Sequence, residues 1–545
     1  MSAKRSSKPT TTTETTPTKR HLVSKPFTTL DSTHFSSVVC LNVLAHVDYN
    51  QKMQCRSVCV KWRELIAETL SELFLTVSPK STLPRNTFPA LTTLVVSYAR
   101  TPLRMQIWAM NNKLKTFVQR HTKTLTEFIV EEVDTMLTPP GGLLDVDPSG
   151  DDEYVLRDAL TTVIPELRSL KTLWVPLVDF PTCTLIQSNT LRQFSMLEKL
   201  TGMYIQDNDF PEAFKELKNL KHLELSVTEK SDPVKLSFVL NHLKKLEYFE
   251  LYSLLCPDGV KLDENNKLDL PNLKHLSIDL RSLESLDKAI DNLNGLQALV
   301  MYGAELENDP TYPEVLAKMT NLEFMDLCPV HILRDWKSGT FVVPVTLNLA
   351  SIAHLRIKTL EIYGYSTDNV DLAPLSNTPS LKKLALKHCN QSTINLDKVA
   401  SLQTVKLSAE TIPPANLASL PALTTLDVKT GSEHSSEWVK VFTSLSDHPT
   451  LTSLRFEQVL YDPVTESDWK QSDYNSLLSL TNLTELKIVS NQQFLLEPTF
   501  VKSLSINLVS LTSLSYEPTS CKPLEPKLYL HFTRLANLKS LKIPR

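Results

Sequence analysis

The sequence predicts an α/β solenoid, a long stack of short repeats with one strand each, preceded by a small helical module. Two observations predict it: a spaced apolar triplet recurs over most of the 545 residues, and a short block with helical spacing precedes that array. A chain of this length exceeds what one compact core supports, so several domains or a repeat array are expected.

In the triplet, two apolar residues lie three positions apart, and a third follows two positions later. Fourteen clear copies have as their middle residue Leu173, Leu223, Phe249, Leu276, Leu299, Met325, Leu360, Leu384, Val405, Leu426, Leu454, Leu486, Leu514 and Leu541. Three weaker copies centre on Leu94, Phe128 and Met203. Each unit predicts one short strand of a parallel sheet with its apolar pair facing inward, while the other residues return the chain along the outside.

This pattern resembles the leucine-rich repeat over roughly 450 residues. The resemblance implies a leucine-rich-repeat horseshoe over residues 85–545, with a parallel sheet on its concave face. The family often places Asn or Cys three residues after the last apolar residue of the strand, where the side chain bonds exposed backbone. We expect an irregular solenoid, because few residues fit that position: Asn208, Cys389 and Asn491, with Thr228 and Thr519 as stand-ins.

The first thirty residues consist mainly of Ser, Thr, Pro, Lys and Arg and contain few residues to bury. Such a segment cannot offset the entropy lost on ordering, so residues 1–30 are predicted to be a disordered tail. A solvated tail is the favoured interpretation of its positive charge, and a nuclear import signal is the alternative.

Residues 31–78 are predicted to form a short helical module. Cys55, Val58, Cys59 and Trp62 recur at helical spacing and therefore share one face. The two cysteines are interpreted as small core residues, since no second pair at zinc-ligand spacing accompanies them.

This block resembles the F-box, a three-helix module. Val58-Cys59-Val60-Lys61-Trp62-Arg63 is similar to the V-C-x-x-W near the end of that family's motif. Phe35-Ser36 occupies the opening Leu-Pro of the family, and Val38 the place of a common acid, so both depart from the pattern. The resemblance implies contacts with a Skp-type adaptor, and so with a cullin complex, through Phe35, Ser36, Leu44, Val47, Val58, Cys59 and Trp62. The alternative is a helical cap that covers the first repeat.

An acidic insertion spans about residues 134–153. Its Asp145-Val146-Asp147-Pro148-Ser149-Gly150 is superficially similar to a calcium-binding EF-hand loop. The twelfth position, however, is Leu156 where a bidentate Glu is wanted, and Pro148 interrupts the loop. A solvated acidic loop is therefore expected.

Composition argues against most other classes of function. The net charge of −4 does not favour nucleic acid or an anionic membrane as a partner. Phosphate-binding, nucleophile-elbow and zinc-protease motifs are absent, so no cofactor, metal or catalytic residue is predicted. The nearest catalytic candidate, His434 with Glu433 and Glu437, is interpreted as an exposed turn. Eight dispersed cysteines without a secretory signal predict a cytoplasmic or nuclear protein.

The outward positions of the strands predict a binding surface for a protein substrate. Aromatic residues and acids dominate its first half: Trp174, Tyr204, Tyr252, Tyr302 and Tyr363, with Glu224, Glu250, Asp279, Asp326 and Glu361. Basic residues dominate the later half: Lys387, Lys406, Lys429 and Arg455. We expect a basic, apolar-tipped partner segment in the first half and an acidic or phosphorylated one in the second. The alternative is that insertions cover the aromatics and the lysines only solvate the surface.

Together the two resemblances imply a substrate-recognition subunit of a cullin-type ubiquitin ligase, in which catalysis belongs to other subunits. The alternative is a leucine-rich-repeat scaffold or inhibitor without a ubiquitin connection.

Overall fold

A computed structural model describes twenty segments of the chain: residues 71–77, 88–98, 113–130, 163–174, 192–205, 212–227, 233–253, 262–263, 265, 267–279, 283–302, 312–328, 349–363, 372–387, 396–409, 417–430, 441–458, 471–489, 498–517 and 526–543. The chain divides into two compact units, residues 1–72 with 86–91, and residues 73–85 with 92–545. The tail, most of the F-box-like module and the acidic insertion lie outside the described residues.

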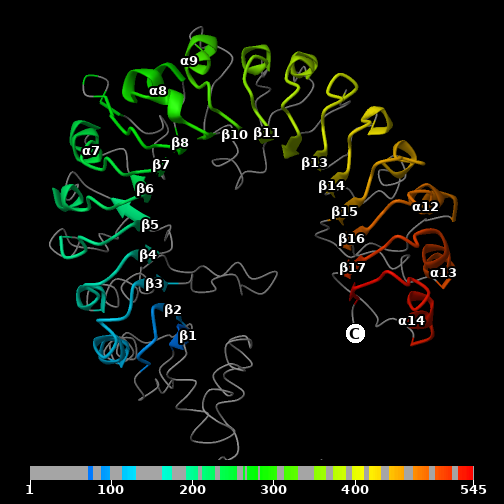
Figure 1. Ribbon diagram of the computed structural model, residues 1–545, viewed down its shortest axis with the longest axis horizontal. Helices are drawn as coiled ribbons and strands as arrows, with labels where there is room; N and C mark the ends of the chain where they lie inside the picture. The colour runs from blue at the N-terminus through cyan, green and yellow to red at the C-terminus, as the bar shows by residue number, and fades with distance from the viewer. Residues whose placement is uncertain are drawn as a thin grey trace, which may run out of the picture. The chain divides into compact units, whose positions relative to one another are not determined.

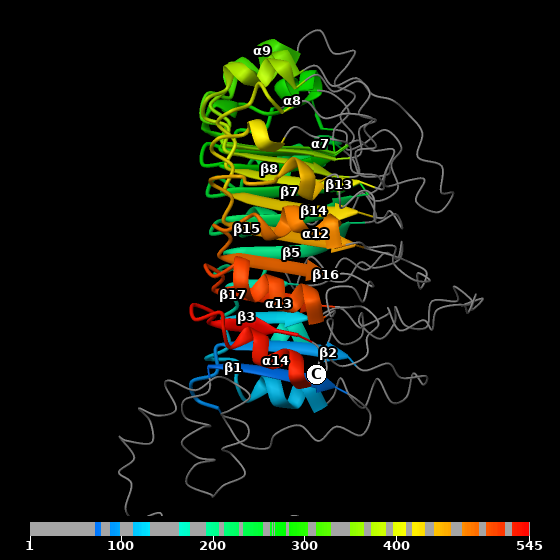
Figure 2. The same ribbon diagram turned by 90° about the vertical axis from the view of Figure 1, so that its right-hand side faces the viewer.

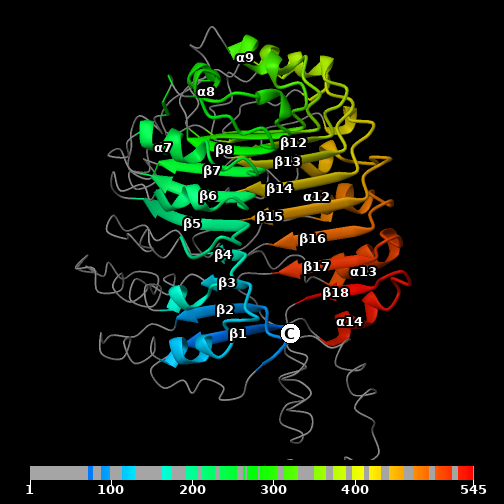
Figure 3. The ribbon, with the colours of Figure 1, turned by 60° about the vertical axis from the view of Figure 1, so that its left-hand side comes forward.

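The second unit contains a parallel sheet, which has eighteen strands in the described part of the chain. The strands are β1 (Glu72–Val77), β2 (Thr93–Tyr98), β3 (Glu127–Val130), β4 (Thr172–Trp174), β5 (Lys199–Ile205), β6 (His222–Val227), β7 (Tyr248–Ser253), β8 (His275–Asp279), β9 (Ala298–Tyr302), β10 (Phe324–Cys328), β11 (Thr359–Tyr363), β12 (Lys383–Lys387), β13 (Thr404–Ala409), β14 (Thr425–Thr430), β15 (Ser453–Gln458), β16 (Glu485–Val489), β17 (Ser513–Glu517) and β18 (Ser540–Lys542). From β2 onward each strand pairs in parallel with the strand of the next repeat, and β1 pairs with β2. In Figure 3 the arrows of β5 to β8 lie side by side and point the same way.

The segments that return the chain between strands lie on the side of the array opposite to the strands, as the labelled helices show in Figure 1. Their helices are α7 (Pro233–Leu240), α8 (Leu283–Ala289), α9 (Tyr312–Lys318), α12 (Gln471–Leu478), α13 (Pro498–Asn507) and α14 (Pro526–Phe532), with a further helix at 113–119. Other repeats return through short 3₁₀ turns, η1 (Ile164–Glu166), η2 (Glu212–Glu216), η4 (Leu349–Ile352), η6 (Ala373–Asn377) and η7 (Leu417–Ser419), while η3 (Leu293–Gly295) follows α8 in the same return segment. Among the described helices, none has the length and apolar character that crossing a bilayer requires.

The core is the row of triplet residues between the strands and the return segments. Leu384 lies opposite Leu360 and Val405 in the neighbouring strands, and the row continues through Leu426 and Leu454 to Leu486. These side chains are buried because the alternation of a strand turns every second residue to the same side. Because each repeat buries its apolar pair against its neighbours, the predicted leucine-rich-repeat solenoid with a parallel sheet is confirmed.

Adjacent repeats are also joined where each strand begins. The carbonyl of Glu247 accepts hydrogen bonds from the amides of Lys274 at 2.9 Å and His275 at 3.0 Å, and equivalent pairs recur from Thr92 to Thr512. Figure 2 shows the strands as arrows that run in nearly parallel directions. Five asparagines, each directly before the first triplet leucine, donate from Nδ2 to a carbonyl of the preceding repeat at 2.7–3.1 Å: Asn219, Asn272, Asn321, Asn482 and Asn537.

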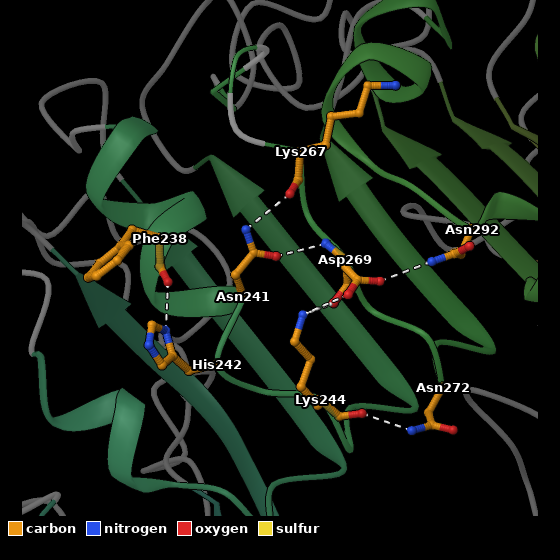
Figure 4. A network of polar contacts seen from close by, with 8 residues as sticks. All are labelled: Phe238, Asn241, His242, Lys244, Lys267, Asp269, Asn272 and Asn292. Atoms are coloured by element: carbon orange, nitrogen blue, oxygen red, sulfur yellow. Dashed lines mark hydrogen bonds and ion pairs between the residues drawn. The ribbon is translucent and has the colours of Figure 1, made fainter.

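The repeat before β8 is held by a polar network centred on Asp269 (Figure 4). Lys244 Nζ donates to the carboxylate of Asp269 at 2.9 Å, and Asn292 Nδ2 donates to its other oxygen at 3.0 Å. The backbone amide of Asp269 donates to Asn241 Oδ1 at 2.7 Å. Three successive repeats are therefore tied together by side-chain hydrogen bonds and an ion pair.

The structure differs from the predicted repeat positions at β5. Leu200, and not Met203, lies opposite Leu223, and the register shifts before Met203 pairs with Leu225. Gly202 makes this possible because it adopts a φ of 76°, which L-residues with a side chain rarely take. A bulge in β5 therefore separates residues that the triplet pattern treated as continuous.

The ends of the array also differ from the prediction. The strand ladder begins at β1, within the range assigned to the helical module, although the solenoid was expected to begin at residue 85. At the other end, Leu541 of β18 is 39% exposed, because in the described array this strand has a neighbour on one side only.

Candidate functional site on the strand face

The strand face consists of the side chains that point away from the core along the ladder. Strand alternation and register arrange them in three rows. The leading row lies just before the first inward residue, as His222 does, and the trailing row lies just after the second, as Tyr252 does. The middle row lies between the two inward residues, as Glu224 and Glu250 do. Parallel pairing brings residues of one row side by side, so the rows are continuous surfaces.

The first strands make the middle row apolar. It begins with Phe74 of β1 and continues through Val95 and Ile129 to Trp174 of β4. Phe74 is 42% exposed and Trp174 is 39% exposed, which is unusual for such large apolar side chains. An exposed tryptophan in a sheet is a residue type that commonly anchors a protein partner.

The strands β6 to β11 carry five acids and neither lysine nor arginine. In this section Glu224 of β6 and Glu250 of β7 lie opposite one another in register. Burial and the neighbouring Glu250 raise the pKa of Glu224 to about 7. Burial also raises the pKa of Glu250, and it raises the pKa of Asp326 to about 6. Burial is the largest cause of each of these three shifts.

Two groups of rings flank those acids. In the leading row, His222 stacks on Tyr248 with ring centroids 3.9 Å apart, and Tyr248 lies 5.9 Å from His275. In the trailing row, the rings of Tyr252 and Tyr302 lie 5.2 Å apart. Burial and the like charge of Lys199 and His275 lower the pKa of His222 to about 4, so its ring is neutral at pH 7.

Hydroxyl groups without a partner lie in the same part of the face. Ser277 Oγ in the middle row of β8 and Ser226 Oγ in the trailing row of β6 are buried and have no hydrogen-bond partner among the described residues. One carboxylate oxygen of Asp326 is also buried and has no hydrogen-bond partner among the described residues. Buried polar atoms are nearly always hydrogen-bonded in folded proteins, so this section has an excess of unused acceptors.

The later strands have a different electrostatic organisation, because their acids and bases pair with each other. The carboxylate of Glu361 forms ion pairs with Lys383 Nζ, at 2.8 Å, and with Lys387 Nζ. Arg455 lies 2.7 Å from Glu457 and 3.8 Å from Asp427. The remaining contacts follow the same plan, with Lys406 3.8 Å from Asp427 and Lys429 3.0 Å from Glu457.

Each substrate-binding residue that the sequence predicted belongs to the strand ladder. Trp174, Tyr252, Tyr302, Lys387, Lys406, Lys429 and Arg455 point outward from it, while Tyr204 and Tyr363 hold trailing-row positions by backbone register. The ladder places Tyr363 of β11 directly opposite Lys387 of β12, whereas the other predicted aromatic residues occupy strands that are not neighbours of those with the predicted basic residues.

Other predicted positions lie outside the described residues. These are the adaptor-binding set Phe35, Ser36, Leu44, Val47, Val58, Cys59 and Trp62, the turn with Glu433, His434 and Glu437, and the family-type positions Asn208, Thr228, Cys389, Asn491 and Thr519.

Sequence reasoning missed His222 and His275, which form the leading-row stack with Tyr248. The sequence contained a signal for these histidines, because each lies directly before the inward leucine of its strand. Reasoning from the sequence also missed the internal ion pairs of the later strands. In the part of the chain that the structure describes, no group of three or more His, Cys, Asp or Glu residues could hold a metal ion.

The chain matches no known family model, and no curated protein is similar to it. Solved structures are similar to it at low identity. An internalin, InlF, from Listeria monocytogenes is 17% identical with a TM-score of 0.32, covering 66% of this chain and 84% of that one. The complex of TLR13 with ssRNA13 is 16% identical with a TM-score of 0.34, covering 83% and 69%. The functional domain of InlJ from Listeria monocytogenes is 13% identical with a TM-score of 0.30, covering 65% and 64%.

The array is a leucine-rich-repeat solenoid. This assignment rests on the recurring triplet and on the parallel ladder that aligns its members. A face of this kind, continuous and built from many short strands, is suited to holding an extended partner.

Proposed function

We propose that this chain is a non-catalytic recognition protein that holds a partner protein against its strand face. The observation that carries the proposal is the exposed Trp174 at the start of a continuous outward surface, followed by the acidic and aromatic section of β6 to β11. Aromatic side chains supply the apolar contact, and charged rows set the orientation and the charge of what binds.

In its finer form the proposal is that the chain recognises substrates for a cullin-type ubiquitin ligase. This rests on the sequence Val58-Cys59-Val60-Lys61-Trp62-Arg63 and its place ahead of the repeat array. The module would bind a Skp-type adaptor, and the strand face would hold the substrate near the catalytic subunits, so that proximity is the chain's contribution. The competing proposal is a scaffold or inhibitor whose helical module only caps the repeats.

A pair of variants of the full chain separates the two activities. V58D/W62D is expected to abolish recovery of an adaptor and a cullin while bound substrate is retained. W174A/Y302A is expected to do the opposite, because it removes ring contacts from the strand face and leaves the module unchanged. The measurement is quantitative mass spectrometry of proteins that co-purify with each variant.

Two results contradict parts of this proposal. If the unaltered chain recovers no adaptor or cullin, the ligase role is wrong and the scaffold role remains. If W174A/Y302A recovers the same partners in the same amounts as the unaltered chain, the strand face is not the binding surface.

For the later strands, we propose that an acidic or phosphorylated segment of the partner binds Lys387, Lys406, Lys429 and Arg455. Such a segment would have to replace the internal acids that these residues now contact. K387E/K406E/K429E is expected to reduce recovery of that partner in the same assay. Unchanged recovery would remove the later strands from the proposed site.

A further inference from the structure

Two groups of acids on the strand face differ in the positive charges that contact them. Glu361, Asp427 and Glu457 each contact lysine or arginine side chains of the same face. Glu224 has neither an ion pair nor a hydrogen bond among the described residues, and Glu250 receives only the phenol of Tyr248. Among the described residues, therefore, the fold neutralises one group internally and supplies no cation to the other.

Register makes this second group a compact cluster of acceptors. Glu224, Glu250 and Ser277 occupy the middle row of three successive strands, β6, β7 and β8. Neighbouring strands are about 4.8 Å apart, so one group can reach side chains from adjacent strands. A lysine ammonium has three N–H donors and an arginine guanidinium has five, and neither is an acceptor. The cluster offers two carboxylates and the unpaired Ser277 Oγ.

The rings beside the cluster suit the rest of such a side chain. The stack of His222, Tyr248 and His275 lies along one side, and Tyr252 with Tyr302 lies along the other. Lysine and arginine have aliphatic stems that pack on apolar surface, and their charged heads are attracted to the faces of tyrosine rings. Between the two rows of rings, a cation would contact carboxylates at its head and rings along its length.

Among the described groups near the cluster, none supplies that cation. Lys199 of β5 weakly favours the charged form of Glu224 but forms no ion pair with it. The other titratable groups described in this part of the face are His222, His275, Tyr248, Tyr252, Tyr302 and Asp279. Two adjacent carboxylates, partly buried and unpaired, are destabilising when both are ionised. A bound cation would relieve that repulsion, which is a source of binding free energy that the paired acids of the later strands do not have.

We propose that Glu224, Glu250 and Ser277, flanked by the two rows of rings, receive one lysine or arginine side chain from an extended segment of the partner protein. This inference rests on the proposed use of the strand face and adds the chemistry that it recognises. The basic residue is the specific contact, and the surrounding rings accept the apolar residues beside it.

The test begins with random dodecapeptides displayed on phage and selected on the full chain. Selected peptides are expected to contain lysine or arginine next to an apolar residue. One such peptide is then synthesised with its basic residue or with glutamine in its place, and its affinity is measured by fluorescence anisotropy. We expect this replacement to weaken binding to the unaltered chain by about tenfold, which is 1.4 kcal/mol.

The double-mutant cycle uses E224Q/E250Q, which keeps the shape of both side chains and removes their repulsion. On this variant the same peptide replacement is expected to have little effect, since the acceptors of the cation have lost their charge. The matched control is E457Q, an acid with internal partners, which is expected to leave the tenfold difference unchanged. Binding to the unaltered chain should also weaken between pH 8 and pH 5.5, and this dependence should be smaller in E224Q/E250Q.

The outcomes separate this inference from the proposed function. Selection of peptides without basic residues, or additive losses in the cycle, would overturn the cation site. If peptides that lack basic residues bind W174A/Y302A more weakly than the unaltered chain, the strand face remains the binding surface. If neither E224Q/E250Q nor W174A/Y302A changes the affinity of any selected peptide, both the inference and the proposed use of the strand face are wrong.

Discussion

At the scale of single residues, the strand face contains two acids that respond to their surroundings in opposite directions. Burial and Glu250 raise the pKa of Glu224 to about 7. Burial also raises the pKa of Glu457, but hydrogen bonds from Lys429 and Arg455 outweigh that effect and leave its pKa lowered. The two residues occupy outward positions of similar strands, so the sign of each shift comes from the neighbours that register supplies.

These shifts predict opposite effects of neutral substitutions on stability. The raised pKa of Glu224 means that its ionisation destabilises the folded state as pH rises from about 4.5, its ordinary value, through about 7. E224Q is therefore expected to be more stable than the unaltered chain at pH 8, by about 1 kcal/mol after allowance for solvent screening. At pH 4 the difference should vanish. Urea denaturation at both pH values measures it.

E457Q serves as the comparison in the same experiment. Because the pKa of Glu457 is lowered, its charged form stabilises the folded state above its ordinary pKa, and that contribution is lost as pH falls. E457Q should therefore be less stable than the unaltered chain at pH 8 and equal to it at low pH. A stabilising effect of E457Q, or a destabilising effect of E224Q at pH 8, would contradict the assignment of these environments.

Single residues also show what the sequence allowed us to predict. The inward positions of the triplet followed from spacing alone, because strand alternation is a local property. The ion pair between Lys387 and Glu361 could not be predicted from spacing, because its partners are 26 residues apart and the repeats vary in length. The asparagines before the triplet leucines were visible as Asn-Leu pairs, but only the register shows that they bond the preceding repeat.

At the scale of elements, β5 shows how one residue sets the register of a repeat. The bulge places Leu200 opposite Leu223 and Met203 opposite Leu225, and the positive φ of Gly202 lies between them. A side chain at this position would be forced into a backbone conformation that costs about 1 kcal/mol or more.

G202A is therefore expected to lower the stability of the array by about 1 kcal/mol, seen as a shift of the thermal midpoint. The control is G295A, because a Cβ at Gly295 would lie 3.5 Å from the carbonyl oxygen of Leu273, which is ordinary contact. A smaller effect for G202A than for G295A would contradict the strained bulge.

The return segments between strands also differ in form from one repeat to the next. The structure uses two kinds of return segment, with regular helices in some repeats and 3₁₀ turns in others. Spacing cannot decide between them, because either form buries its apolar residues against the same leucine row. Around Asp269, side-chain bonds join successive repeats, and no local pattern reveals them (Figure 4).

At the scale of the whole molecule, the array is quasi-one-dimensional, because each strand of the described ladder pairs only with its sequence neighbours. In such an architecture a loss of packing acts mainly on adjacent repeats. The completely buried Leu426 in β14 is a suitable site at which to test this.

L426A is expected to cost about 2–5 kcal/mol locally, from lost burial and the cavity left behind. Hydrogen exchange measured by mass spectrometry should show faster exchange in β13, β14 and β15, with the amides of β6 to β8 still protected. Equal acceleration in both regions would show that the array unfolds as one cooperative unit.

The sequence by itself determined the repeat, the inward row of apolar residues and the order of aromatic, acidic and basic residues along the strands. It could do so because those features depend on local spacing and strand alternation. Only the tertiary structure decided which charges neutralise one another, where the register shifts, and that Glu224 and Glu250 lie together with no ion-pair partner among the described residues. Those properties depend on which residues of different repeats face each other, and loops of unequal length hide that pairing from the sequence.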